Sequence, residues 1–495
     1  MRKYWSIFMG LLLSCPLLAQ NEIDALRYSQ TNFGGTARSI AVGGAFGALG
    51  ADFSSASFNP AGLGLYRGNE IMITPGFNVT NHRSDFLGNQ AEEIHYNLNF
   101  SNFGFVHTNL LVDSRGNNMH DKWRAYSFAF GFNRLNNFQS RQFYSGFNAE
   151  SSISNFYANE LRGTHPSGIN PGSVGFEPSL AYETFLVDPV SGDSTNYVSR
   201  IPNGMVEQNA TIDERGGINE FTLSFAGNYD DRLYMGATIG FPRVNYTNEL
   251  SFTERDVLDS IPGFRSLDVN RELQTQGWGI NFKGGMAYRV ANWLRLGAAV
   301  HSPTYFRLED EYSSNMTNRL DSETITRESP DGNFSYNLTT PWRVIGSAAF
   351  IISKYGFLSV DYEFVDYSES FYSFGSGNQL TASQQNNNIR NLYGPASNLR
   401  VGAEGVIDNI RLRAGYAYYG SPFKDDVETA GGDQIQQFIT GGIGFREESF
   451  YLDLGFARRM SNDFLGFYTM PDDSGVGSLN EVNRNQIVMT VGFRL

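Results

Sequence analysis

Cysteine is nearly absent from this 495-residue sequence, and so are long apolar runs. The single cysteine, Cys15, lies in a start that has the order of a secretory signal peptide, with Arg2 and Lys3, an apolar run and then Ala19. We expect residues 1–19 to be removed, although the LLSC sequence leaves a lipoprotein signal as an alternative. A mature chain without a thiol excludes disulfides and thiolate catalysis. No later run reaches the roughly 20 apolar residues that a transmembrane helix needs.

Catalytic and metal-binding motifs are missing as well. The sequence contains no H-E-x-x-H, no G-x-S-x-G and no cluster of histidine with cysteine. A glycine-rich run at 43–50 lacks the G-x-G-x-x-G spacing and the strand and helix that flank a nucleotide-binding loop. We therefore predict that the protein is not an enzyme, has no catalytic residue, and carries no cofactor and no metal ion.

Positive charge is scarce. The chain has 37 Lys and Arg against 51 Asp and Glu, a formal charge of −14, and removing Arg2 and Lys3 takes this charge to −16. Such acidity repels phosphate backbones, so we expect no nucleic-acid partner.

The rest of the composition favours a membrane barrel. Hydrophobic residues make up only 41%, whereas aromatic residues reach 14% and there are 53 glycines. This balance is typical of a barrel with a hydrated interior and aromatic rings at the membrane boundaries. No linker, charge block or change of composition divides the chain, so we expect one large architecture.

From residue 69 onward, apolar side chains recur at every second position. Tyr126, Phe128, Phe130 and Phe132, for example, alternate with small or polar residues, which predicts a strand with one apolar face. We count about fourteen such strands. Their predicted starts lie near Asn69, Ile94, Arg124, Asn219, Arg232, Gln274, Trp293, Phe334, Tyr355, Asn398, Ile410, Gln437, Ser449 and Arg484.

Short and long connections alternate between these strands. Short turns such as 229–232 are followed by long polar segments, which include 81–93, 249–273 and the longest, 138–216. This asymmetry predicts an all-β fold, a transmembrane antiparallel β-barrel over residues 69–495 with long extracellular loops. A large soluble β-sandwich or propeller is the alternative, but it explains neither the asymmetry nor the lack of a repeat of about 40 to 50 residues.

The segment before the first strand has a different character. Residues 20–68 are rich in Gly, Ala and Ser, nearly free of charge around 43–51, and end in a turn at Asn59-Pro60. Small residues allow close backbone packing but provide no wide apolar face, so we predict a plug inside the lumen, the hatch segment. The hatch residues assigned to the site are Phe46, Leu49, Phe53, Phe58, Asn59 and Pro60.

The Gly/Ala run at 43–48, Asp52, Ser55 and the NPAGL sequence at 59–63 resemble the N-terminal region of the FadL/TodX family of outer-membrane transporters. The segment LRLGAAVHSP at 294–303 is similar to the family as well. The resemblance implies a hatch-filled barrel in the bacterial outer membrane. It also implies inward movement of hydrophobic compounds, typically long-chain fatty acids, with lateral exit into the membrane. The matching residues are structural, so they imply a transport class and not a substrate.

Basic side chains occupy the polar face of several predicted strands. Because a charge facing lipid costs about 2 to 4 kcal/mol, these side chains should point into the lumen or lie at a membrane boundary. They either pair with carboxylates such as Asp361 and Asp453 or hatch carbonyls, or receive the carboxylate of an amphipathic ligand. The ligand or lumen candidates are Lys283, Arg289, Arg295, His301 and Arg343.

One predicted strand changes phase. Its apolar positions run through Ile94, Leu98 and Phe100 and then shift to Phe103. A shift of this kind predicts a β-bulge near Ser101, and bulges often lie beside functional openings.

The expected partners are outer-membrane lipid and a hydrophobic small-molecule ligand. Barrels similar to the FadL/TodX family also serve in type IX secretion, so an alternative is a barrel that holds exported proteins through its long loops. A lipid-modifying enzyme is a third reading, but the sequence lacks the arrangement of a nucleophile with its base.

Overall fold

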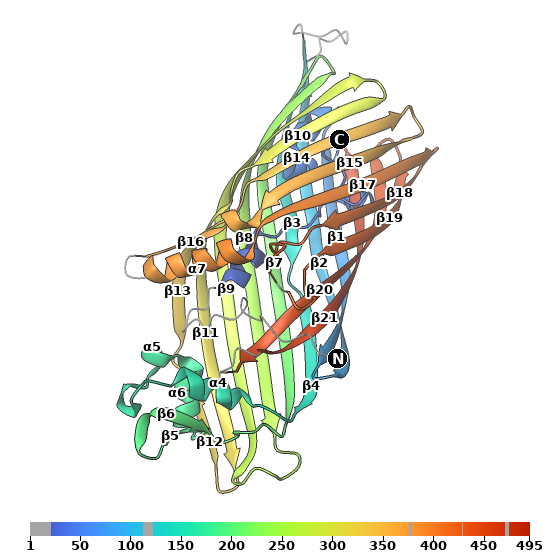
Figure 1. Cartoon of the computed structure of the whole chain (residues 1–495). Helices are drawn as coiled ribbons and strands as arrows, with labels where there is room; N and C mark the ends of the chain where they lie inside the picture. The colour runs from blue at the N-terminus through green and yellow to red at the C-terminus, as the bar shows by residue number, and fades with distance from the viewer. Residues whose placement is uncertain (1–20, 112–121, 376–378, 428, 471–474) are drawn as a thin grey trace.

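The computed structural model describes residues 21–111, 122–375, 379–427, 429–470 and 475–495 (Figure 1). The predicted signal peptide, residues 1–19, lies outside them. Within the described chain no helix is long and apolar enough to cross a membrane.

Fourteen strands of the described chain close into one antiparallel ring, which confirms the predicted fold class. Each strand pairs with the next one around the ring, and the last pairs with the first, as in Phe77 opposite Ile487. The ring consists of β1 (Glu70–Phe86), β2 (Asn89–Leu110), β3 (Trp123–Asn137), β7 (Val206–Tyr229), β8 (Leu233–Arg255), β9 (Phe264–Ala291), β10 (Leu294–His301), β14 (Arg343–Ile352), β15 (Gly356–Asp366), β17 (Pro395–Ile407), β18 (Ile410–Tyr419), β19 (Gln436–Arg446), β20 (Phe450–Thr469) and β21 (Gly475–Arg494).

The alternation in the sequence determines which side chains of each strand face outward and which face the interior. Along β3, Phe128 and Phe130 point outward and are exposed, whereas Ser127 and Ala129 are buried against the interior. The same pattern holds for most of the ring, so the outer surface is a band of large apolar side chains. A band of this kind suits contact with lipid chains.

Several segments expected to be loops are strands. The predicted loop 81–93 is wrong, because these residues pair in the β1–β2 hairpin, which turns at Leu87-Gly88. The predicted loop 249–273 is wrong in the same way, since β8 and β9 extend over most of it. These extensions bury Phe252, Leu267 and Val269 against the 138–216 segment, but charged and amide side chains are frequent between these positions, so the sequence alone indicates a polar loop.

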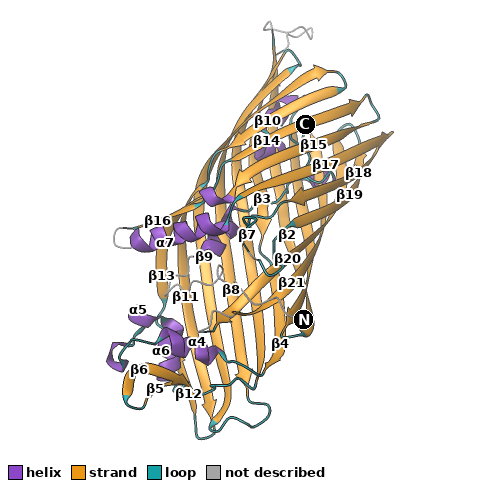
Figure 2. Cartoon of the chain, in the orientation of Figure 1, coloured by secondary structure: helices purple, strands orange, loops and turns teal. Residues whose placement is uncertain are grey.

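The long-loop end of the barrel carries further elements (Figure 2). They include most of the helices outside the lumen, and those of the 138–216 segment form one small module that packs against the extended strands. The elements are β4 (Ser140–Asn148), α4 (Ile153–Glu160), η2 (Pro166–Gly168), α5 (Pro171–Val174), α6 (Phe176–Glu183), β5 (Val187–Val190), β6 (Asp193–Ser199), β11 (Tyr305–Leu320), β12 (Thr324–Glu328), β13 (Gly332–Thr339), η3 (Tyr367–Glu369), β16 (Phe371–Phe374) and α7 (Gln379–Leu392).

The predicted bulge in β2 is confirmed. Thr74 of β1 pairs with Asn102 and Pro75 pairs with Phe100, so Ser101 has no partner of its own. At the same level the pairing of β2 with β3 ends, at Asn102 opposite Asn133. From Ser101 back to its start, β2 is paired with β1 on one edge and not with β3 on the other.

The described hatch segment, 21–68, lies inside the ring. It consists of α1 (Glu22–Ser29), α2 (Ala37–Ala41), α3 (Ser55–Phe58) and η1 (Pro60–Leu65). Its glycines allow this close packing, since a Cβ on Gly47 would meet the Ser347 side chain at 2.1 Å and one on Gly64 would meet the carbonyl of Gly227 at 2.8 Å. Both partners belong to strands of the wall, so the segment contacts the ring on several sides.

Candidate functional site

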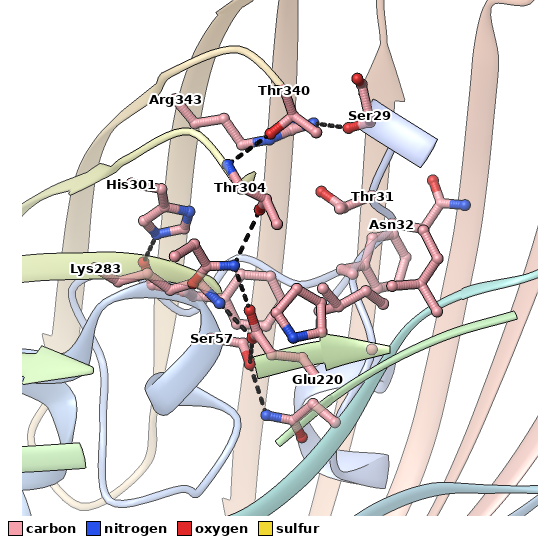
Figure 3. Close-up of a pocket in the computed structure, with 18 of the residues that line it drawn as sticks. Ser29, Thr31, Asn32, Ser57, Glu220, Lys283, His301, Thr304, Thr340 and Arg343 are labelled. Carbon is pink, nitrogen blue, oxygen red and sulfur yellow. Dashed lines mark hydrogen bonds and ion pairs between the residues drawn. The ribbon is translucent and has the colours of Figure 1, made fainter. Parts of the chain in front are cut away.

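A cavity of about 60 Å³ lies between the hatch segment and the barrel wall (Figure 3). Three of the five predicted lumen candidates, Lys283, His301 and Arg343, line it together. Hatch residues cover the other side, among them Ser57 and Phe58. The structure therefore brings these residues of β9, β10 and β14 to one place.

Lys283 is neutralised by a carboxylate that the sequence analysis missed. Its ammonium group forms an ion pair with Glu220 of β7, and both side chains are buried. Glu220 also accepts hydrogen bonds from Asn281 at 3.0 Å and from the hydroxyl of hatch residue Ser57 at 3.1 Å. The pair thus ties one element of the hatch segment to two strands of the wall.

Arg343 belongs to a second buried network. Its guanidinium donates to Glu363 at 2.7 Å and to the carbonyl of Ser29 at the end of α1 at 2.5 Å. Arg400 donates to the other oxygen of Glu363 at 3.0 Å, and Asn398 adds a further hydrogen bond. One carboxylate therefore binds two arginines, and a second donor of Arg343 binds the hatch backbone.

His301 acts on the hatch backbone too. Its Nε2 lies 2.8 Å from the carbonyl oxygen of Phe58. A carbonyl oxygen can only accept, so Nε2 carries the proton and donates it. Pro303 lies two residues later, between β10 and β11.

Arg289 and Arg295 do not join this group. They stand directly opposite each other on β9 and β10 near the short-turn end, and neither lines the cavity around Lys283. The structure thus separates two of the five candidates from the other three.

The hatch residues named from the sequence are all buried or nearly so. The amides of Phe46 and Gly47 donate to one oxygen of Asp361 at 3.0 and 2.9 Å. Phe53 packs at Gly104 and Gly131, where any Cβ would collide with its ring. These contacts make the hatch segment complementary to the glycines and carboxylates of the wall.

Asn59 and Pro60 form the predicted fixed turn. The side chain of Asn59 donates to the carbonyls of Gly47 and Met286, at 2.6 and 3.0 Å, and its oxygen caps η1. Pro60 occupies the first turn of η1, where a missing N–H costs no hydrogen bond. The asparagine therefore joins two parts of the hatch segment and the wall.

Chemically, the site is a set of paired charges with no reactive arrangement. In the described residues no group of three or more His, Cys, Asp or Glu is placed to hold a metal ion. Asp361 and Asp453, the two carboxylates named from the sequence, both lie near arginines. Asp453 pairs with Arg413 at 2.6 Å, and Asp361 lies 3.9 Å from Arg400. Glu220 and Glu363 occupy inward-facing positions in the alternation of their strands. This alternation is the sequence feature that could have identified them.

Residues 218–469 match the family model of outer membrane protein transport proteins (OMPP1/FadL/TodX). The chain belongs to this family. The OMPP1/FadL/TodX proteins are outer-membrane transport proteins and not enzymes, so this chain is an outer-membrane β-barrel of that class.

Two solved structures have a similar fold. The toluene transporter TodX of Pseudomonas putida is 12% identical with a TM-score of 0.54, and covers 94% of this chain and 99% of its own. A FadL homologue of Pseudomonas aeruginosa is 12% identical with a TM-score of 0.55 and the same coverage. No curated protein matches the sequence. At this identity the likeness to the two structures concerns the fold alone.

Proposed function

We propose that this protein takes up hydrophobic or amphipathic small molecules across the outer membrane, with long-chain fatty acids as the first substrate class to test. The observation that carries the proposal is a closed barrel whose lumen is filled by the hatch segment and whose wall pairing is interrupted between β2 and β3. A membrane-facing interruption offers an apolar molecule a path that avoids water.

The interior in this state is too small for such a molecule. The cavity at Lys283 holds about 60 Å³, whereas ligand pockets ordinarily span about 300 to 1,000 Å³. Transport therefore requires a second state in which the hatch segment has moved. The ion pairs and backbone hydrogen bonds that hold the segment are the contacts that such a movement exchanges.

The interruption in the wall is closed by side chains in place of a ladder. Asn137 of β3 donates to Asn97 of β2 at 3.3 Å, whereas the hydrogen bond from Asn99 to the same oxygen, at 3.2 Å, stays within β2. We call this stretch between β2 and β3 the seam. Side-chain hydrogen bonds break with less disruption than a backbone ladder, so the seam is the part of the wall best suited to lateral exit.

A chain of hydrogen bonds links the seam to the hatch segment. Asn102, next to the bulge, donates to Asn133 at 2.6 Å, and Asn133 donates to Ser57 at 2.8 Å. Ser57 donates in turn to Glu220, the partner of Lys283. Movement of Ser57 would remove a hydrogen bond from Asn133, which forms the last residue pair before the seam with Asn102. Movement of the hatch segment would therefore favour opening of the seam.

The test is uptake by cells that lack other transporters of this family. Cells that express the protein should accumulate labelled hexadecanoate faster than cells that express none, and gently purified protein should carry a lipid-like ligand detectable by mass spectrometry. Accumulation of toluene but not of hexadecanoate would assign the substrate to small aromatic hydrocarbons. A stoichiometric protein in the purified sample, without a ligand and without uptake, would support the secretion role instead.

A further inference from the structure

A second cavity of about 60 Å³ lies beside residues Phe33 and Gly34 of the hatch segment, which also line the first cavity. Three arginines line it, Arg134 of β3, Arg459 of β20 and Arg484 of β21, and none of its described lining residues is acidic. No sequence motif had indicated these three residues.

The absence of a carboxylate distinguishes this cavity from the one at Lys283. There, Lys283, Arg343 and Arg400 all form ion pairs with Glu220 or Glu363. In the described chain neither Arg459 nor Arg484 has a carboxylate within ion-pair distance, although the two stand directly opposite each other across β20 and β21. Like charges in directly opposed positions are destabilising, so the arrangement has a cost that an anion would remove.

The hydrogen bonds of the three arginines leave donors free. Arg484 donates to Thr80 at 3.1 Å and to the carbonyls of Asn137 and Gln139. Arg134 donates to Asn219 at 3.1 Å. The Nε of Arg459 is buried without any hydrogen-bond partner. A buried charged donor without a partner is expensive, and a ligand oxygen would satisfy it.

Acids do occur in the adjoining cavity of about 190 Å³, which shares Arg459 and Arg484 and also contains His82. These acids are otherwise engaged. Glu214 accepts a hydrogen bond from Tyr246 at 2.6 Å, and Asp463 accepts one from Gln434 at 3.4 Å. In the described chain neither acid lies within ion-pair distance of the two arginines, so their attraction offsets the charge of the cluster only in part.

The cavity also has an apolar side and a position beside the seam. The rings of Phe33 and Phe438 meet there at 4.7 Å between centroids, and Ala457 lies next to them. Ser101, the bulged residue of β2, is part of the lining. The hatch segment contacts β3 at this level, because the amide of Asn32 donates to the carbonyl of Leu135 at 2.9 Å.

We infer that Arg134, Arg459 and Arg484 form the binding site for the anionic headgroup of an amphipathic ligand, namely a carboxylate whose apolar tail packs on Phe33 and Phe438. The inference rests on the proposed uptake function and names the headgroup site for it. Guanidinium groups suit this role, because they stay charged and present forked donors to two oxygens. Lys283 and Arg343, whose charges are already matched, then serve to hold the hatch segment.

The experiment compares two ligands with the same tail, hexadecanoate and hexadecanol, on the full-length protein. Binding to the R459Q/R484Q variant should be about 10- to 100-fold weaker for hexadecanoate, because charge-assisted hydrogen bonds are lost, and unchanged for hexadecanol. The matched control is R458Q, since Arg458 is the neighbouring residue on the exposed face and donates only to Asn483. R459K/R484K keeps the charge without the fork and should lie between the wild type and R459Q/R484Q.

Folding of each variant is verified by the shift of its band on a gel between unheated and heated samples. Hexadecanoate affinity equal to the wild type in folded R459Q/R484Q would overturn the assignment, and so would a selective loss in K283Q alone. A phosphate-containing lipid that co-purifies with the wild type and not with R459Q/R484Q would show that the site binds the headgroup of a membrane lipid. That result would overturn the assignment of a carboxylate. If the wild type binds neither ligand, the uptake function fails and not only the headgroup site.

Discussion

Replacing Asp361 by alanine should release the glycine-rich part of the hatch segment while the barrel stays folded. The Asp361 side chain is fully buried, and one of its oxygens accepts the amides of both Phe46 and Gly47. Its contact with Arg400 is longer, at 3.9 Å, and Arg400 keeps Glu363 as a partner. The substitution therefore removes an anchor of the hatch segment and the more distant of the two carboxylates that face Arg400.

The size of the effect follows from the two hydrogen bonds. A hydrogen bond to a charged group contributes about 1.5 to 3 kcal/mol, so loss of two weakens attachment by about 3 to 6 kcal/mol before any relaxation. Each 1.4 kcal/mol corresponds to a factor of about ten, so local opening should become at least about 100-fold more frequent. D361N keeps one acceptor oxygen and should have an intermediate effect.

The assay is amide hydrogen exchange of the full-length protein, followed on peptides that contain residues 43–51. Exchange of the Phe46 and Gly47 amides should accelerate strongly in D361A and less in D361N, with the strand peptides unchanged. If these amides keep wild-type protection in folded D361A, Asp361 is not an anchor, and the reasoning from its hydrogen bonds is wrong.

Three further predictions concern other parts of the molecule. Glu220 and Lys283 form a buried ion pair, so either E220M or K283M alone should lower the free energy of unfolding by about 3 to 5 kcal/mol, because one charge stays buried without its partner. The double variant should be close to neutral, and denaturant unfolding measures both effects. Burial raises the pKa of Asp24 in α1 from 3.8 to about 7, against the opposing charge of Arg27, so docking of α1 should be strongest below about pH 4 and should weaken as pH rises from 4 to 7. Exchange protection of α1 should fall over that range and become independent of pH in D24N. A tag at Asp230 should be hidden on intact cells and one at 191–192 should be labelled; labelling of the first would reverse the orientation.

The sequence is sufficient for the ring because the membrane imposes a pattern on it. Residues such as Phe128 and Phe130 must face lipid and their neighbours must not, so the strands are visible from alternation alone. The shift from Phe100 to Phe103 was equally visible, and it placed the bulge correctly at Ser101. The extensions were missed because their apolar residues, such as Leu267 and Val269, stand among many charged and amide residues and pack against a loop segment and not against lipid.

The candidate site was only partly predictable. Lys283, His301 and Arg343 could be assigned to the lumen from the phase of their strands, but their partners depend on the register between strands. Glu220 meets Lys283 across a separation of 63 residues, and no local rule gives that register. Arg459 and Arg484 were missed because each is unremarkable alone, and only their direct pairing makes a cluster.

The central claim is that the hatch segment must move for uptake, and a reversible lock tests it most directly. A Cβ on Gly47, next to Ala48, would lie 3.0 Å from the Cβ of Ser347. This is close to the separation of about 3.8 Å in a disulfide, so G47C/S347C can form one after a small shift. The chain's single cysteine, Cys15, lies in the predicted signal peptide and would not compete.

The measurement is hexadecanoate uptake by cells that express G47C/S347C, before and after reduction, with the disulfide verified by mass spectrometry. We predict that the oxidised protein does not take up hexadecanoate and that reduction restores uptake. Single variants G47C and S347C provide the matched controls and should transport under both conditions. Undiminished uptake in the verified locked state would contradict the account, because the hatch segment would then be a filler of the lumen and not its gate.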